Sequence, residues 1–150
     1  MLDSIAGDWS RVLDLFAGTG ALGIEALSRE AEYADFVDQN GKCCQIIKQN
    51  LSKTGFTDRG HVYCSPVMKA LNILDNSYGI IFLDPPYADT TLGAVIKSID
   101  GSKLLNEDSV IVASHSARSP LDERFGSLLK IKEKRYGDTG ISIYRKEVTP

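Results

Sequence analysis

Residues 80–87 read Ile80-Ile81-Phe82-Leu83-Asp84-Pro85-Pro86-Tyr87 and join an apolar run to an acidic, proline-rich turn. From Tyr78 to Leu83, five of six positions are apolar or aromatic, which is typical of a buried strand in a parallel sheet. Proline donates no backbone hydrogen bond and fixes its φ angle, so the strand is expected to end at Asp84. Open α/β sheets bind ligands at the carboxyl ends of such strands. The stretch therefore predicts an acidic turn at a ligand site.

A glycine-rich loop near the start of the chain gives a second signal. Residues 11–16 are expected to form a strand around Asp14, and Ala17-Gly18-Thr19-Gly20 follows directly. Apolar residues then recur at helical spacing over residues 22–29. Strand, glycine loop and helix in this order are half of a nucleotide-binding unit.

The rest of the chain continues this alternation and then changes. The residues between 137 and 140 form a connection too short for a parallel crossover, so the strands on either side are expected to pair as a hairpin. The sequence thus predicts an α/β fold in which a parallel sheet with helices is followed by a hairpin. Further strands are expected at 33–37, 61–64, 78–84, 110–113, 128–136 and 141–144, helices at 42–54, 67–74 and 91–99, and at most a short helix at 121–125.

Length and composition are those of an ordinary globular protein. A chain of 150 residues predicts a single domain, and its net charge of -3 argues against tight nucleic-acid binding by this chain alone. No secretory signal is evident and no apolar run approaches the ~18 residues of a membrane span, so we expect a cytoplasmic protein without membrane contact.

Cysteine and histidine spacing gives no reason to expect a metal site. Cys43, Cys44 and Cys64 include no C-x-x-C pair, and we expect reduced thiols packed as small apolar residues. His61 and His115 lie far apart in the sequence and are expected to be structural.

Two cofactors fit the first glycine loop. Gly18, Gly20 and Gly23 match the G-x-G-x-x-G fingerprint of dinucleotide-binding proteins. Asp14 argues for a different ligand, because its charge repels a pyrophosphate and suits a cationic group such as the α-ammonium of S-adenosylmethionine. Asp38, at the end of the second strand, can accept hydrogen bonds from both ribose hydroxyls of either cofactor.

The turn at residues 84–87 suits chemistry on an amino group attached to an aromatic base. Such a nitrogen is a poor nucleophile because its lone pair is delocalised into the ring. The Asp84 side chain and the Pro85 carbonyl are candidates to bind its N–H groups, and Tyr87 to stack on the base. This is positioning and electrostatic stabilisation, and it does not need Asp84 to be a strong base.

Lys130, Lys132 and Lys134 alternate along a predicted strand, so they are expected to share one face. That face is either a solvated edge or a contact with phosphate groups.

The stretch from Leu13 to Arg29, Asp38, residues 84–87 and the closing Tyr136-Gly137-Asp138-Thr139 together resemble the bacterial 16S ribosomal RNA (guanine-N2)-methyltransferases. These belong to the class I methyltransferases, which depend on S-adenosylmethionine. The likeness covers about residues 12–144. It implies a Rossmann-like, seven-stranded sheet of order 3-2-1-4-5-7-6, mostly parallel, with an antiparallel last strand and helices on both faces.

The resemblance also implies a site and a substrate. The substrate would be 16S rRNA or the 30S particle, and no metal would take part. Family members usually begin with a basic segment that grips RNA, which this chain is expected to lack. Implied cofactor contacts are Asp14, Phe16, Ala17, Gly18, Gly20 and Asp38, and implied contacts to the target base are Asp84, Pro85, Pro86 and Tyr87.

The chain departs from the family pattern after its third strand. Where such enzymes usually carry an Asp or Asn that seats the adenine, this sequence has Pro66. Adenine recognition is therefore expected to rest on backbone groups around Val67.

Four other functions remain open on the sequence alone. The acceptor could be adenine N6 in DNA or RNA, or a glutamine amide in a protein; those enzymes more often carry Asn before the two prolines, so Asp84 mildly favours nucleic acid. The chain could bind the cofactor without catalysing transfer. The literal glycine fingerprint admits an NAD-dependent oxidoreductase, against which Asp14 and the Pro-Pro turn argue.

Overall fold

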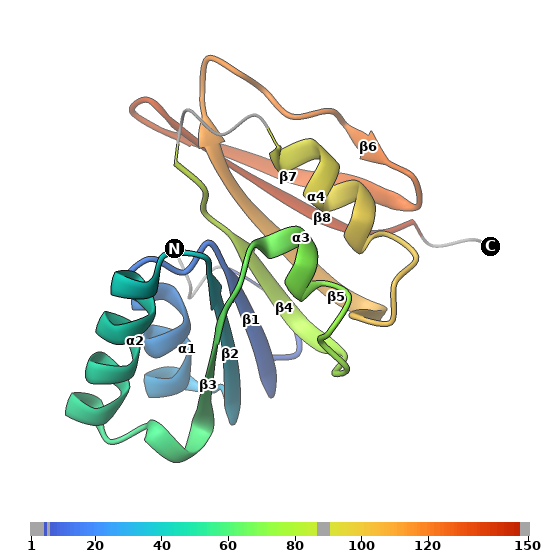
Figure 1. Cartoon of the computed structure of the whole chain (residues 1–150). Helices are drawn as coiled ribbons and strands as arrows, with labels where there is room; N and C mark the ends of the chain where they lie inside the picture. The colour runs from blue at the N-terminus through green and yellow to red at the C-terminus, as the bar shows by residue number, and fades with distance from the viewer. Residues whose placement is uncertain (1–4, 6, 87–90, 148–150) are drawn as a thin grey trace.

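A computed structural model describes residues 5, 7–86 and 91–147. Its centre is one eight-stranded sheet of order β3-β2-β1-β4-β5-β8-β7-β6 (Figure 1). The first five strands run parallel to one another and the last three are antiparallel. The parallel strands are β1 (Arg11–Leu15), β2 (Tyr33–Asp38), β3 (Gly60–Cys64), β4 (Tyr78–Leu83) and β5 (Leu105–Ser116).

The apolar run chosen from the sequence is the central strand of this sheet. All six residues of β4 are buried, because β1 and β5 pair with its two edges and apolar layers cover both faces. Burying a side chain such as Ile80, Ile81 or Phe82 contributes about 1.5–3 kcal/mol, which explains why this run is so strongly apolar. The strand ends at Leu83, two residues before Pro85.

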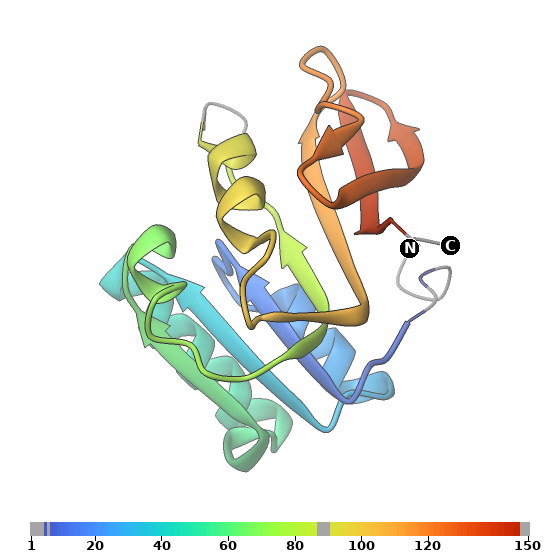
Figure 2. The ribbon, with the colours of Figure 1, turned by 90° about the vertical axis from the view of Figure 1, so that its right-hand side faces the viewer.

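Helices cover both faces of the parallel half (Figure 2). Helices α1 (Ala21–Arg29) and α2 (Gly41–Thr54) pack on one face, against side chains such as Phe36. Helices α3 (Val67–Ala70) and α4 (Leu92–Ile99) pack on the other. As predicted for a mostly parallel sheet, the expected helix-on-both-faces architecture is confirmed.

Local sequence signals set the first and last residues of helix α2. The Asn40 side chain accepts hydrogen bonds from the backbone N–H groups of Lys42 and Cys43, which is a standard N-cap. At the other end Gly55 has φ 80°, the left-handed conformation that ends helices and that glycine adopts without strain.

The antiparallel half contains one strand more than the resemblance implies. Strands β7 (Leu128–Tyr136) and β8 (Thr139–Lys146) form the predicted hairpin, and β8 joins it to β5. The extra strand is β6 (Arg124–Phe125), so the expected seven strands are eight and the short helix expected at 121–125 is absent. The reason is a tight turn at Gly126 (φ 60°), which brings Phe125 against Leu128 and buries its ring.

Several strands and helices begin or end at other residues than the sequence predicts. Strand β5 is much longer than 110–113, because Leu105 pairs with Tyr78 at its start and residues 114–116 pair with β8 at its end. Helix α3 ends at Ala70 rather than at residue 74, and residues 71–73 continue as turns.

Strand β7 contains a bulge that overturns one prediction. Its pairing with β8 shifts between Lys130 and Lys132, so Lys130 lies opposite Tyr144 and Lys132 opposite Ile143. Neighbouring residues of β8 point to opposite faces of the sheet. Lys130 therefore does not share a face with Lys132 and Lys134, and its side chain is only 4% exposed.

Within the ranges that the structure describes, no helix is long and apolar enough to cross a membrane.

Candidate functional site

The site is built from one row of residues across the sheet. Val37, Leu15, Leu83 and Ala113 lie in register on β2, β1, β4 and β5, each at or near the carboxyl end of its strand. The residues that follow them are Asp38, Phe16, Asp84 and Ser114. Parallel pairing therefore brings together segments that are far apart in the chain.

A cavity of about 900 Å³ opens at this edge, within the size range of small-molecule sites. Seven of the predicted site residues line it, whereas Asp14, Ala17 and Gly20 do not. Tyr87, predicted to stack on the target base, lies outside the described residues. The seven residues that line the cavity are Phe16, Gly18, Asp38, Val67, Asp84, Pro85 and Pro86.

The glycine loop turns sharply between β1 and α1. Phe16 has φ 60°, which is uncommon for a residue with a side chain, and such strained conformations cluster at functional sites. Gly18 and Gly20 also have positive φ, at 60° and 80°. A Cβ at Gly18 would meet nothing within 4 Å, so this position leaves open space beside the cavity for a ligand to approach the backbone.

The third glycine of the fingerprint has a packing role. A Cβ on Gly23 would lie 2.4 Å from the Phe36 ring, so only glycine lets α1 lie this close to β2. The close approach of helix to strand accounts for Gly23 without a dinucleotide.

Asp38 is oriented for a ligand by the backbone around it. One carboxylate oxygen accepts a hydrogen bond from the Gly18 N–H and the other from the Asn40 N–H, both at 2.9 Å. A carboxylate has about four acceptor positions, so each oxygen keeps one for another donor. Because Asp38 lines the cavity, its two remaining acceptor positions suit the two hydroxyls of a ribose.

Asp14 lies beneath the glycine loop and is 1% exposed. One of its oxygens accepts a hydrogen bond from the Gly23 N–H at 3.0 Å, and the other has no hydrogen-bond partner among the described residues. Burial raises the pKa of Asp14 to about 8, and the carboxylates of Asp84 and Asp38 add to this effect. The side chain thus ties α1 to β1 at the base of the site.

The charges around the cavity are of one sign. Its described lining includes two carboxylates, Asp38 and Asp84, and no lysine or arginine. A pyrophosphate would have no positive side chain to pair with there, whereas a cationic ligand would have two carboxylates. This arrangement favours S-adenosylmethionine over a dinucleotide as the fitting cofactor.

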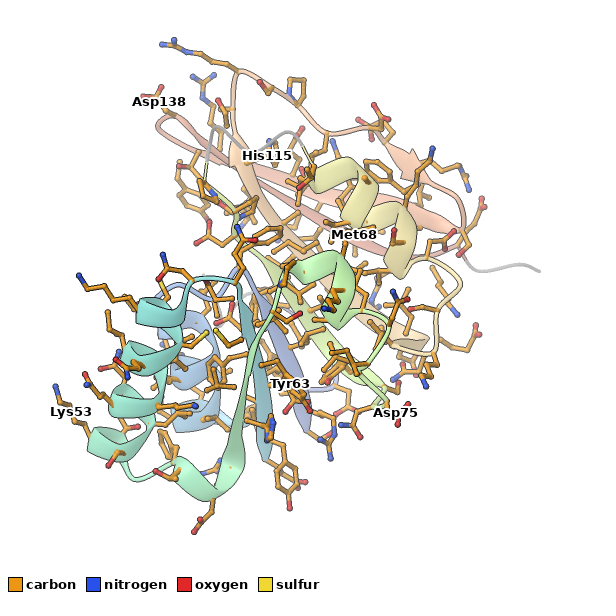
Figure 3. The ribbon with its side chains drawn as sticks, viewed as in Figure 1. Lys53, Tyr63, Met68, Asp75, His115 and Asp138 are labelled. Atoms are coloured by element: carbon orange, nitrogen blue, oxygen red, sulfur yellow. The ribbon has the colours of Figure 1, made fainter. Side chains whose placement is uncertain are left out.

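The opposite wall of the cavity is mostly apolar. Pro66, Val67 and Met68 come from the start of α3, and Cys43 comes from the first turn of α2. Neither Cys43 nor Met68 belongs to a motif, so no pattern in the sequence predicts them here. Figure 3 shows Met68 on α3, beside the sheet. Thr91 and Val95 of the α4 region also line the cavity and were not predicted.

The acidic turn borders the same cavity. Asp84 and Pro86 are exposed, while Pro85 between them is buried. The carboxylate of Asp84 is therefore held at the mouth of the cavity by a stiff backbone.

The three thiols do not all behave as predicted. Cys44 is buried and donates a hydrogen bond to the Asp38 carbonyl at 3.2 Å, but Cys64 is exposed because β3 is an edge strand.

His115 is structural as expected, since both ring nitrogens are hydrogen-bonded. Across the described ranges no group of three or more His, Cys, Asp or Glu side chains is arranged to hold a metal ion.

Comparisons with known proteins agree with this geometry. Residues 1–145 match the protein family described as Conserved hypothetical protein 95. The chain is 42% identical to the "Putative rRNA methyltransferase YlbH" of Bacillus subtilis over 93% of this chain and 77% of that protein. It is 36% identical to a ribosomal RNA small subunit methyltransferase D of Buchnera aphidicola, over 90% of this chain and 69% of that protein.

Solved structures share the fold. A conserved hypothetical protein from Streptococcus pyogenes superposes with a TM-score of 0.86 at 36% identity, over 91% of this chain and 86% of the other. The crystal structure of "SMU.776, a putative methyltransferase complexed with SAH" superposes with a TM-score of 0.74 at 15% identity, over 90% of this chain and 44% of the other. At this identity the match shows likeness of fold alone. The chain therefore belongs to the Conserved hypothetical protein 95 family, with the ribosomal RNA small subunit methyltransferases D among its relatives, and it has the Rossmann-like fold of class I methyltransferases.

Proposed function

We propose that this protein transfers a methyl group from S-adenosylmethionine to the exocyclic N2 amino group of a guanine in 16S rRNA. The observation that carries the proposal is the row of residues at the carboxyl edge, where Asp38 after β2 and Asp84 after β4 border one cavity. One carboxylate suits the cofactor and the other suits an amino group. The names of the rRNA methyltransferase relatives support the choice of acceptor.

The residues present fit the cofactor. Asp38 keeps two acceptor positions for the ribose hydroxyls, and Gly18 leaves room beside the backbone. Val67 and its neighbours in α3 offer an apolar wall for the adenine, in place of the acidic or amide side chain usual after the third strand. When bound, the cofactor supplies a methyl group on a positively charged sulfur, which the two carboxylates of the cavity favour.

Asp14 contributes indirectly in this proposal. Its hydrogen bond to the Gly23 N–H fixes the start of α1, and so it fixes the loop that contains Gly18 and Gly20. Its negative charge, when present, adds to that of Asp38 and Asp84.

The acceptor half of the site consists of Asp84, Pro85, Pro86 and Tyr87. Asp84 and the Pro85 carbonyl accept hydrogen bonds from the two amino hydrogens, which draws the nitrogen lone pair away from the ring and toward the methyl group. The bound cofactor would supply the methyl group, and Asp84 or water would accept the proton that the methylated nitrogen loses. Most of the rate enhancement comes from this alignment.

An rRNA substrate needs cations on the protein. Lys132 and Lys134 share one face of β7 and have no ion-pair partner in the described part of the chain. Lys134 lowers the pKa of Lys132, as expected for two like charges held close together. Phosphate groups would relieve this repulsion.

The experiment that tests the proposal offers several acceptors at once. The protein and tritiated S-adenosylmethionine are incubated with unmethylated 30S subunits, naked 16S rRNA, DNA or a protein extract. We expect label in 16S rRNA, recovered as N2-methylguanosine after digestion. Label only in N6-methyladenosine or in protein would assign another acceptor, and no transfer despite saturable cofactor binding would mean that this chain only binds the cofactor.

A binding measurement separates the proposal from the oxidoreductase alternative. Calorimetry is expected to show saturable binding of S-adenosylmethionine and none of NAD. The opposite result would contradict the assignment of the glycine loop.

A further inference from the structure

A second, smaller cavity lies on the other side of the Pro-Pro turn. It has a volume of about 270 Å³, and Pro85 and Pro86 line both cavities. Its other walls come from the start of α4, from the end of β5 and from residues 119–121. The site described above does not use these walls.

The chemistry of this cavity is neutral. None of the described residues that line it is Lys, Arg, Asp or Glu. Prolines and leucines form the apolar surfaces, among them Leu92 and Pro120, and serine hydroxyls lie between them. The hydroxyls of Ser114 and Ser119 have no hydrogen-bond partner within the described residues, so both are available to a ligand.

His115 gives the cavity a rigid side. Its Nδ1 is 2.9 Å from the Ser116 carbonyl oxygen and its Nε2 is 2.8 Å from the Ser142 hydroxyl. A Cβ at Gly140 would lie 2.6 Å from the imidazole, so glycine there leaves the ring its space. Figure 3 shows His115 at the same end of the molecule as Asp138 of the hairpin, far from Lys53 and Asp75.

The loop after β5 holds one of the free hydroxyls in place. The Ser119 N–H donates a hydrogen bond to the Ser116 carbonyl at 3.0 Å, which closes a turn directly after the strand. Ser114 follows Ala113, the residue in register with Leu83, so it occupies on β5 the place that Asp84 occupies after β4.

We propose that this cavity binds the nucleobase of a nucleotide adjacent to the methylated one. The volume lies just below the range of sites for whole cofactors or drug-sized ligands, which suits one base. A base has apolar faces and a polar edge, matching the apolar walls and free hydroxyls, whereas a phosphate would lack a cation here. This inference rests on the proposed function, because it takes RNA as the substrate.

The shared wall explains how two neighbouring bases are separated. The target base has to reach Asp84, which lines the larger cavity only. A base on the far side of Pro85 and Pro86 would be held apart from it by a stiff turn. Unstacked bases of single-stranded RNA are the form that proteins read in this way.

The two histidines of the chain provide a direct test, because each gives its own imidazole signals in a nuclear magnetic resonance spectrum. His115 lines the cavity, whereas His61 lies on β3 at the other edge of the sheet and serves as an internal control. The protein, saturated with S-adenosylhomocysteine, is titrated with guanosine, adenosine, cytidine, uridine or ribose 5-phosphate. We expect at least one nucleoside to shift the His115 signals in a saturable manner while His61 stays unchanged, and ribose 5-phosphate to have no effect.

Two variants sharpen the titration. Ser119→Trp fills the mouth of the cavity and is expected to weaken nucleoside binding at least about tenfold, whereas Ser98→Trp, at an exposed position of α4 outside both cavities, should bind as the unaltered protein does. No response of His115 to any nucleoside, equal shifts of both histidines, or equal effects of the two variants would overturn the inference.

A transfer assay then distinguishes this inference from the proposed function. With an RNA acceptor, Ser119→Trp should raise KM at least about tenfold and change kcat little, since the cavity contributes binding and not chemistry. A lowered kcat at unchanged KM would contradict the inference. Failure of the unaltered protein to methylate any RNA would overturn the proposed function, while the histidine titration, which needs no transfer, would still report on the cavity.

Discussion

Asp14, Asp38 and Asp84 lie near the ends of three strands and have three different surroundings. Asp14 is buried, and one of its oxygens has no hydrogen-bond partner among the described residues. Asp38 accepts two backbone hydrogen bonds, and Asp84 is exposed at the turn. The sequence predicts that all three are important, because each follows or interrupts an apolar strand. It does not predict that Asp14 points beneath the loop, because this depends on how closely α1 packs on the sheet at Gly23.

Asp14 should make the stability of the protein depend on pH. The pKa is 3.8 in the unfolded chain and about 8 in the folded protein, so the folded protein holds the extra proton between these values. Stability is therefore greatest below about pH 4 with respect to this group and falls by roughly 1 kcal/mol per pH unit as the pH rises toward 8. Urea unfolding from pH 5 to 8 should show a smaller decline for Asp14→Asn.

The control for this prediction is Asp138→Asn, at an exposed position of the hairpin. It should leave the slope unchanged. An identical slope in Asp14→Asn and the unaltered protein would show that another group causes the pH dependence.

Replacing Asp38 should weaken cofactor binding. Asp38→Ala removes the acceptors for the ribose hydroxyls and the two bonds that hold the Gly18 and Asn40 backbones. Loss of hydrogen bonds to a charged group costs about 1.5–3 kcal/mol each, so Kd for S-adenosylmethionine should rise at least about tenfold by calorimetry. Asp58→Ala, at an exposed position in the short 3-10 turn that follows α2, is the control; equal affinity in both variants would remove Asp38 from the cofactor site.

At the scale of the elements, local sequence patterns predict the strands and helices of the parallel half better than the strands of the antiparallel half. Strand β4 and helix α2 have limits set by prolines, an Asn cap and a glycine, all local signals. The bulge in β7 and the strand β6 depend on pairing with distant residues, which no local pattern encodes. For this reason the alternation of three lysines predicts that all three share one face of β7, whereas in the structure Lys130 points to the opposite face.

The bulge leaves Lys132 and Lys134 together on a face of β7, where we predict contact with RNA phosphates. Reversing both charges, Lys132→Glu with Lys134→Glu, should lower RNA affinity and reduce the slope of log Kd against log salt by about two. The matched control reverses Lys48 and Lys53, both exposed on α2. Equal losses in the two double variants would indicate a general charge effect and not a contact.

At the scale of the whole molecule, parallel strands bring together short motifs that are far apart in the chain. The register of Leu15, Val37 and Leu83 makes the glycine loop, Asp38 and Asp84 neighbours, as the alternation of strands and helices predicts. Cys43, Met68, Thr91 and Val95 also line the cavity, but they belong to no motif. Their places follow from how α2, α3 and α4 pack, which only the folded structure reveals.

The central claim is that this edge of the sheet holds a cofactor and an amino group at once, with Asp84 positioning the latter. Methyl transfer to 16S rRNA in 30S subunits, measured side by side with calorimetry of S-adenosylmethionine for the unaltered protein and Asp84→Ala, tests it most directly. We predict N2-methylguanosine with the unaltered protein, and a kcat about 100- to 1000-fold lower in Asp84→Ala with cofactor affinity largely retained. Equal transfer by both proteins would contradict the account.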